Sequence, residues 1–285
     1  MNQRDEILDR VRATPDLPGG APTAVWLLQD PDCDLRRLAS ELERDVALSA
    51  NLLRAANSAA FGGSRSVSTV REAVTRLGQA RVLQWVVACA VGPTAARAVM
   101  GYDLPAGKLW EHSLAAAVGA EQLAKDLRLP STGEFFTAGL LHDVGKIVLG
   151  NFVQVDVAAL VDLSMREEIP FVEAERRWLG IDHAEVGAEL LRHWGLPDRL
   201  VQACRWHHDP DGAPEPSTAA DLVHAADALS LAAGLGVGID GLRVRVCPGV
   251  VERQNLNLAR VERTAGRMLA ALAEAGDLYN GITGR

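Results

Sequence analysis

The stretch "GLLHDVGKIVLG", residues 139–150, decides how the rest of the chain is interpreted. It places a histidine and an aspartate, His142 and Asp143, in an otherwise apolar run, with Gly145 and Lys146 directly behind them. A buried imidazole or carboxylate costs free energy unless a partner satisfies it. The doublet therefore predicts a buried polar site whose other members come from elsewhere in the chain.

Helical spacing of apolar residues dominates on both sides of this stretch, and alternating strand patterns are nearly absent. Asp182 with Glu185 resembles a capping box, which places His183 in the first turn of its helix. The spacing predicts helices at about 108–127, 133–149, 153–168, 171–179, 183–194, 198–208 and 217–233, and an amphipathic one in "VERTAGRMLAALAEA", 261–275. The predicted fold class is all-α.

About five further helices are expected in the first hundred residues. After the capping residue Asp34, one apolar face comprises Leu35, Leu38, Leu42 and Val46, and we expect it to pack against the second half of the chain. The next helix carries Leu48, Leu52 and Ala56 on one face and is expected to end at Gly62 and Gly63. A capping box at Thr69 and Glu72 starts another helix, which Gly78 should close.

Composition narrows the class of protein. The chain has 285 residues, 48% of them hydrophobic and 23% charged, and a net charge of −8 with no Lys/Arg block, so we expect neither a nucleic-acid surface nor an anionic-membrane surface. The charged N-terminus is unlike a secretory signal, and no apolar run approaches the roughly 18 residues of a membrane span. Four dispersed cysteines predict reduced thiols. We expect a cytoplasmic protein.

The chain's seven histidines are candidate ligands; they are His112, His142, His183, His193, His207, His208 and His224. Imidazole with carboxylate and no nearby thiolate favours Fe, Mn or Zn over Ca or Mg. If the doublet is helical, adjacent side chains diverge by about 100° and could straddle two metals, with the Asp143 carboxylate bridging. Lys146 returns to the same face, where a lysine can hold a phosphate.

Each of these residues also has an ordinary structural interpretation. A lone His142 would more often be a hydrogen-bonded core histidine, and a lone Lys146 a surface lysine. His193, near a helix C-terminus, fits a charge that complements the helix dipole. His224, three residues before Asp227, is left open. The joint occurrence of the motifs is what favours a metal site.

The motifs together resemble a known family. "LLHDVGK", "DHAEVGAELL", "WHHDP" and "LVHAADAL" resemble the HD superfamily of metal-dependent phosphohydrolases. "ERDVALSANLLRAANSAAFGGSRSVSTVREAVTRLG" and "FFTAGLLHDVGKIVLGNF" further resemble the HDOD domain, the HD-related output domain of bacterial signalling proteins, over about residues 15–235. This implies a helical HDOD fold, with an N-terminal helical unit (1–100) packed on an HD-like helical core (101–285). The break in "MGYDLPAGKL", 100–109, marks that boundary.

The resemblance also implies a set of site residues. By similarity to HD enzymes, one metal would be held by His112, His142, Asp143 and Asp227. By similarity to HD-GYP phosphodiesterases, a second would be held by Asp143, His183, His207 and His208. Lys146 matches their phosphate-facing lysine, so Asp143 and Lys146 would be the catalytic residues. The implied cofactors are two divalent ions, with Fe or Mn favoured over Zn or Mg.

Two positions depart from the HD-GYP pattern. The chain reads "HHDPDGAPEP" where those enzymes have D-G-x-G-Y-P, and Lys108 stands where some of them have a glutamate that completes a third metal site. These departures remove the features tied to cyclic-di-GMP.

Three functions remain. The one we expect is a signalling protein that binds a divalent metal pair and acts through a protein partner or a nucleotide-type ligand, with an oligomer left open. The alternative is an active phosphohydrolase or phosphodiesterase on a nucleotide or cyclic dinucleotide, favoured by the complete ligand set. The third is a helical interaction module with vestigial histidines.

Overall fold

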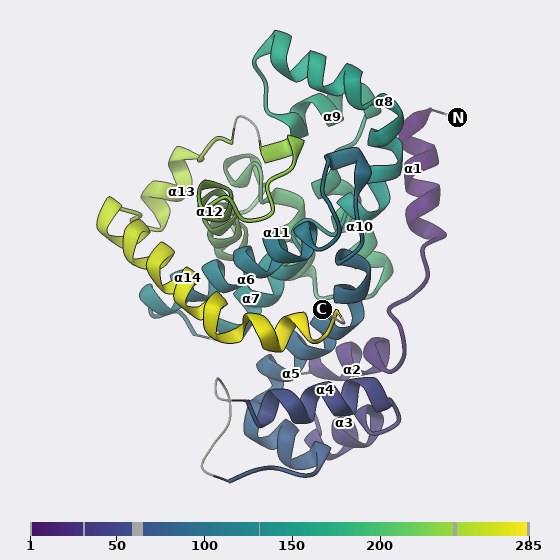
Figure 1. Cartoon of the computed structure of the whole chain (residues 1–285), viewed down its shortest axis with the longest axis vertical. Coiled ribbons are helices and arrows are strands. Elements are labelled where there is room, and N and C mark those ends of the chain that lie inside the picture. Colours follow the sequence, from purple (N-terminus) through teal and green to yellow (C-terminus); the bar gives the residue numbers. More distant parts are fainter. Residues whose placement is uncertain (1, 31, 59–64, 131, 242–243, 284–285) are drawn as a thin grey trace.

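The computed structural model describes residues 2–283 except 31, 59–64, 131 and 242–243. Within these ranges every regular element is a helix, and the β-interaction is an isolated bridge between Val99 and Leu104. The prediction of an all-α fold is therefore confirmed (Figure 1).

Among the described residues, five helices precede residue 100. They are α1 (Gln3–Arg12), α2 (Ala21–Leu28), α3 (Leu35–Leu42), α4 (Val46–Ala56) and α5 (Val70–Ala95). Helices α2, α3 and α4 pack on α5 and form the lower lobe in Figure 1. Helix α1 lies apart from this lobe and packs against α8 and α10 of the second half.

In the described part of the chain, nine α-helices follow residue 100, together with three short 3₁₀ turns. The helices are α6 (Lys108–Asp126), α7 (Thr132–Leu141), α8 (Lys146–Glu167), α9 (Phe171–Leu179), α10 (His183–His193), α11 (Asp198–Trp206), α12 (Thr218–Ala232), α13 (Pro248–Arg253) and α14 (Leu258–Asn280). The turns are η1 (Met100–Tyr102), η2 (Pro210–Gly212) and η3 (Ile239–Gly241). Helix α6 is central, because α7, α12 and α14 all pack on it, and α5 joins the lower lobe to α7. The division at residue 100 stays a prediction.

The expected apolar face after Asp34 is correct at its start and wrong at its end. Asp34 caps α3, and Leu38 and Leu42 are buried, but Val46 is 83% exposed. The reason is Asp45, whose side chain accepts hydrogen bonds from the backbone N–H groups of Ala47 and Leu48 and starts a new helix there. Helix α3 packs chiefly on α2 and α5, so this face does not form the contact with the second half.

Replacing Leu42 with aspartate is expected to lower the free energy of unfolding by about 3 kcal/mol or more. Leu42 is 1% exposed, so the substitution removes apolar contacts and buries a carboxylate without a partner. Val46→Asp is the matched control, and it should change stability by less than about 0.5 kcal/mol because Val46 faces solvent. Thermal unfolding of both variants measures the difference. Equal melting temperatures would contradict this packing.

The second correction concerns the His-Asp doublet. It lies in a four-residue turn, 142–145, between α7 and α8, and not inside the helix predicted at 133–149; α8 then continues through the predicted break near residue 151. The turn lies so close to α10 that a Cβ on Gly145 would stand 1.9 Å from the carbonyl oxygen of His183. This tertiary contact sets the position of the break.

Several local predictions are confirmed. Thr69 and Glu72 form the capping box of α5, and Gly78 interrupts that element with a φ of 73°. Asp182 caps α10 through the backbone N–H of Glu185, so His183 is its first residue. The predicted helix end at Gly62 and Gly63 lies outside the described residues.

The stretch Thr132–Glu167 has the length and composition of a membrane-spanning helix, because an 18-residue window in it has a mean hydropathy of 1.6. It is divided into α7 and α8 by the turn at 142–145, and it carries the buried His142, Asp143 and Lys146. Of that window, 44% is buried inside the fold.

Candidate metal centre

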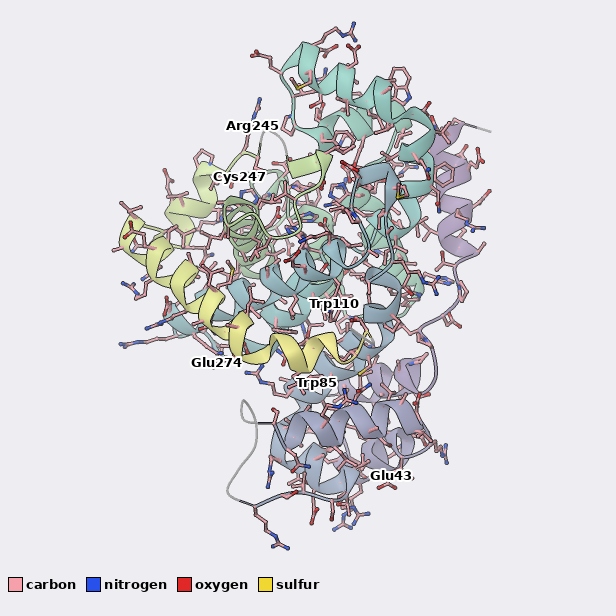
Figure 2. All side chains as sticks on the ribbon, in the orientation of Figure 1. Glu43, Trp85, Trp110, Arg245, Cys247 and Glu274 are labelled. Carbon is pink, nitrogen blue, oxygen red and sulfur yellow. The ribbon has the colours of Figure 1, made fainter. Side chains whose placement is uncertain are left out.

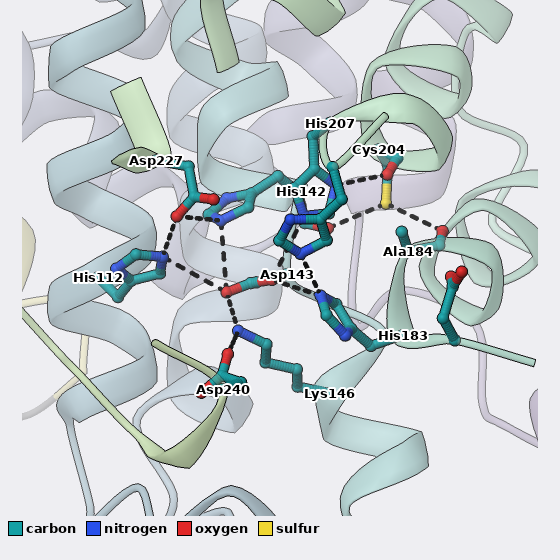
Figure 3. A network of polar contacts seen from close by, with 12 residues as sticks. His112, His142, Asp143, Lys146, His183, Ala184, Cys204, His207, Asp227 and Asp240 are labelled. Atoms are coloured by element: carbon teal, nitrogen blue, oxygen red, sulfur yellow. Dashed lines mark hydrogen bonds and ion pairs between the residues drawn. The ribbon is translucent and has the colours of Figure 1, made fainter. Parts of the chain in front are cut away.

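The seven predicted ligands come from five parts of the fold and meet in its interior (Figure 3). They are His112 on α6, His142 and Asp143 in the α7–α8 turn, His183 at the start of α10, His207 and His208 just after α11, and Asp227 on α12. All are buried except His208, which is partly buried.

The ligand atoms form two groups, each with its atoms within 4.8 Å of one another. One contains His112, His142 and Asp227, and the other contains Asp143, His183, His207 and His208. These groups match the two metal sites that the family resemblance implies, with Asp143 between them.

Asp143 faces both groups through different oxygens (Figure 3). Its Oδ2 lies 3.5 Å from His112 Nε2 and 3.3 Å from His142 Nε2. Its Oδ1 lies 3.4 Å from His183 Nε2 and 3.8 Å from His207 Nε2. The carboxylate therefore has the placement of a bridging ligand.

Hydrogen bonds to the outer ring nitrogens hold four of the imidazoles with Nε2 toward the centre. The Nδ1 atoms of His112, His142 and His207 bond to the backbone oxygens of Leu235, Gly139 and Cys204 at 2.7–3.1 Å. The Nδ1 of His183 bonds to Glu175 Oε2 at 2.7 Å. Outer-shell partners of this kind are typical of metal-ligating histidines.

Three polar atoms at the centre make no hydrogen bond among the described residues: Nε2 of His142, Nε2 of His207 and Oδ1 of Asp143. Buried polar atoms without a hydrogen-bond partner are rare and call for an explanation. All three are ligand-type atoms, and they converge on one place. The residues present therefore fit a bound metal.

The pKa values of the second group follow from burial and its neighbours. Burial alone would lower the pKa of His183, but the Glu175 carboxylate outweighs it and raises that pKa to about 9. Burial and His142 lower the pKa of His207 to about 3, and burial and His207 hold that of His208 well below its usual range. His183 Nε2 and His208 Nε2 lie 2.8 Å apart, so a proton on His183 is shared between them. A metal would displace this proton on binding.

Lys146 lies below Asp143 in Figure 3, between two carboxylates. Its Nζ donates to Asp143 Oδ2 at 2.5 Å and to Asp240 Oδ2. Burial alone would lower its pKa, but Asp143 and Asp240 raise it above its ordinary value. Burial would likewise raise the pKa of Asp143, but His142 and Lys146 hold it well below its usual range. The centre thus keeps a charged ammonium beside a charged carboxylate.

The remaining two histidines do not join the ligand groups. His224 accepts a hydrogen bond at Nε2 from the backbone N–H of Cys247 and bonds through Nδ1 to the oxygen of His207. Both of its ring nitrogens therefore hydrogen-bond to backbone groups. His224, which the sequence left open as a site residue, has a structural role in this arrangement. His193 bonds through Nε2 to the backbone oxygen of Thr14 and belongs to neither ligand group.

A cavity of about 400 Å³ opens onto the centre. Its floor includes Lys146 and Asp227, and Phe171 and Val172 contribute an apolar wall. Three arginines also line it, of which Arg176 and Arg177 pair with Glu173; Arg245 is labelled in Figure 2. The arrangement suits a ligand that has both an anionic and an apolar part.

Sequence reasoning missed two acidic residues of the site. Glu175 orients His183 through its ring and its backbone N–H, and it also accepts from the Tyr102 hydroxyl at 2.7 Å. Asp240 pairs with Lys146 from 94 positions away. Glu175 lies on the buried face of α9, where an apolar residue is the usual choice. A glutamate at an otherwise apolar position was the signal in the sequence that could have revealed its role. Nothing local distinguishes Asp240.

The helices and the buried cluster define an all-helical domain built around a His–Asp centre. The model of the HDOD domain matches residues 14–210. This chain belongs to the HDOD family.

Three proteins are similar to this chain in sequence or in structure. An "Uncharacterized protein" of Treponema pallidum is 30% identical over 73% of this chain and 40% of its own length, so the chain spans about two fifths of that relative. An HDOD domain protein of unknown function from Geobacter sulfurreducens has a TM-score of 0.70 at 24% identity, covering 98% of this chain and 97% of that one. A "Putative phosphohydrolase" from Shewanella amazonensis has a TM-score of 0.63 at 26% identity, covering 92% and 97%.

Proposed function

We propose that this HDOD protein is a signalling protein whose centre binds two divalent metal ions and whose cavity receives a nucleotide-type ligand through its phosphate. The observation that carries the proposal is the pair of ligand groups joined by Asp143 and open to a cavity that contains Lys146. Imidazole and carboxylate ligands suit Fe, Mn or Zn, and the resemblance to HD enzymes favours Fe or Mn. The ligand-dependent state would then be passed to a protein partner.

Each part of the cavity has a counterpart in such a ligand. The Lys146 ammonium supplies a positive charge for a phosphate oxygen, and the wall at Phe171 and Val172 supplies an apolar surface for a base or sugar. Its volume of about 400 Å³ lies in the range of small-molecule sites.

A second function, hydrolysis of a phosphate ester, is favoured by the completeness of the ligand set. All seven positions implied by the HD and HD-GYP resemblance carry ligand-type side chains, and their ligand atoms face one another. Two bound metal ions would supply Lewis acidity toward phosphoryl oxygens and activate a water. The chain's own part would be to orient the phosphate at Lys146 and to hold the imidazoles in place through Glu175 and the backbone.

Elemental analysis of protein purified without chelator is expected to find about two Fe or Mn ions per chain. Removing them with a chelator should lower the melting temperature, and adding Mn back at about a hundred times its Kd should restore about 2.7 kcal/mol of stability for each site that is filled. The metal-loaded protein is then assayed on mononucleotides, cyclic nucleotides, cyclic dinucleotides and an aryl phosphodiester.

The results separate the two functions. Metal loading with ligand binding and no turnover supports the signalling function, whereas turnover of any of these esters supports the hydrolase. A protein that neither loads metal nor gains stability from Mn would contradict both.

A further inference from the structure

Residues 235–241 form a strap across the centre, after α12 has ended. The oxygen of Leu235 holds His112 through Nδ1, and Asp240 in η3 pairs with Lys146. The strap lies close to its neighbours: a Cβ on Gly236 would stand 2.3 Å from the Lys108 oxygen. The strap is thus closely packed against the centre, and it lies outside the residues that the HDOD model matches.

Asp240 is a nearly buried carboxylate in this strap. Its side chain is 11% exposed and that of Lys146 is 4% exposed, and both residues line the cavity. A carboxylate can take the place of a phosphate oxygen as the acceptor of an ammonium's hydrogen bonds, since both are anionic oxygen acceptors. The position on Lys146 that a ligand's phosphate would use is therefore already filled from within the chain.

We propose that Asp240 is an internal competitor for the anion position of Lys146, so that a phosphate-bearing ligand binds only by displacing the strap. The inference rests on the proposed function for the chemistry of the ligand, and it adds the regulation of that site. With Asp240 in place, a second anion beside Lys146 meets a negative charge at close range and is repelled. When the strap is displaced, Lys146 is left with the ligand and Asp143.

Displacing the strap has a second effect, because the same segment holds a candidate metal ligand. Leu235 and Asp240 are five residues apart in this strap. Movement of Asp240 away from Lys146 therefore strains the hydrogen bond between the Leu235 oxygen and His112 Nδ1. Occupation of the anion position is therefore coupled to the orientation of the His112 ring. This coupling gives the centre a way to report that the cavity is filled.

The test is calorimetric titration of inorganic phosphate into the full chain, with and without bound Mn. Asp240→Asn is expected to lower the Kd for phosphate at least about tenfold, because it removes the competing charge and nearly keeps the side-chain shape. The matched control is Asp126→Asn: Asp126 is a mostly buried carboxylate that pairs with Arg267, and it does not line the cavity. This control should leave the Kd within about twofold of the wild type.

Further measurements distinguish the proposed competition from a folding defect. Hydrogen exchange of residues 235–241 should increase in wild type when phosphate is added, and should already be high in Asp240→Asn without phosphate. Asp240→Ala repeats the titration with a side chain that cannot bond Lys146 at all. Metal content and melting temperature are measured for each variant, so that a folding defect is seen directly.

The outcomes are distinct. An unchanged or increased Kd in both Asp240 variants would overturn the inference, since Asp240 would then position Lys146 or play no part. Failure of phosphate to bind any variant overturns it as well. A tighter Kd in protein that holds no metal keeps this inference and rejects the metal centre.

Discussion

Replacing Asp143 with asparagine is expected to abolish the binding of both proposed metal ions. Among the described residues of the two groups, Asp143 is the one whose oxygens face both, with Oδ2 toward His112 and His142 and Oδ1 toward His183 and His207. Asparagine nearly keeps the shape but removes the charge and replaces one ligand oxygen with an N–H₂ donor. Elemental analysis should fall from about two ions per chain to a trace, and added Mn should no longer raise the melting temperature.

The control for this substitution is Asp126→Asn. Asp126 is also a mostly buried carboxylate with a cationic partner, Arg267, but it lies at the end of α6 away from the centre. This variant should keep both ions. If Asp143→Asn retains one tightly bound ion, the two groups are independent sites and the carboxylate does not bridge them.

The second large effect is expected at Lys146. Lys146→Ala should keep the metal ions, because an ammonium has no lone pair for a metal. On any ester that the wild type hydrolyses, kcat should fall by roughly two to three orders of magnitude, the usual loss when one charge contact to the transition state is removed. In the absence of turnover, the same variant should lose measurable binding of inorganic phosphate.

Lys125→Ala is the matched control, because Lys125 pairs with Glu121 on α6 and does not reach the cavity. It should behave as the wild type in both assays. Wild-type turnover or wild-type phosphate binding in Lys146→Ala would show that Lys146 is not the phosphate site, whatever the fate of the metal centre.

The parts of the fold that sequence predicted well are those set by local chemistry. Asp34 and Asp182 cap helices where their side chains reach backbone N–H groups two or three residues on, and the predicted start at His183 is confirmed for that reason. The seven candidate ligands come together, and the family motifs include residues from each of the five parts of the fold that supply them.

The parts that failed depend on contacts made at long range. The position of the turn at 142–145 depends on the close approach of Gly145 to α10. The helical periodicity of the sequence does not indicate this contact. The pairing of Asp240 with Lys146 spans 94 positions, and a single acidic residue in a glycine-rich segment predicts nothing. Val46 failed for the opposite reason: the local cap at Asp45 overrode an apparent continuation of the apolar face.

The position of α1 has a consequence for how the chain is made. This helix leaves the ribosome before α8 and α10, yet it packs on both of them, and Arg4 pairs with Glu185 across 181 positions. During synthesis α1 therefore lacks its packing partners until the lower lobe and the helices up to α10 have been made. The apolar side chains of Ile7 and Val11, fully or almost fully buried in the finished protein, remain unpaired throughout that interval. Helix α1 therefore reaches its native contacts only after α8 and α10 have been made, and those contacts span most of the sequence between them.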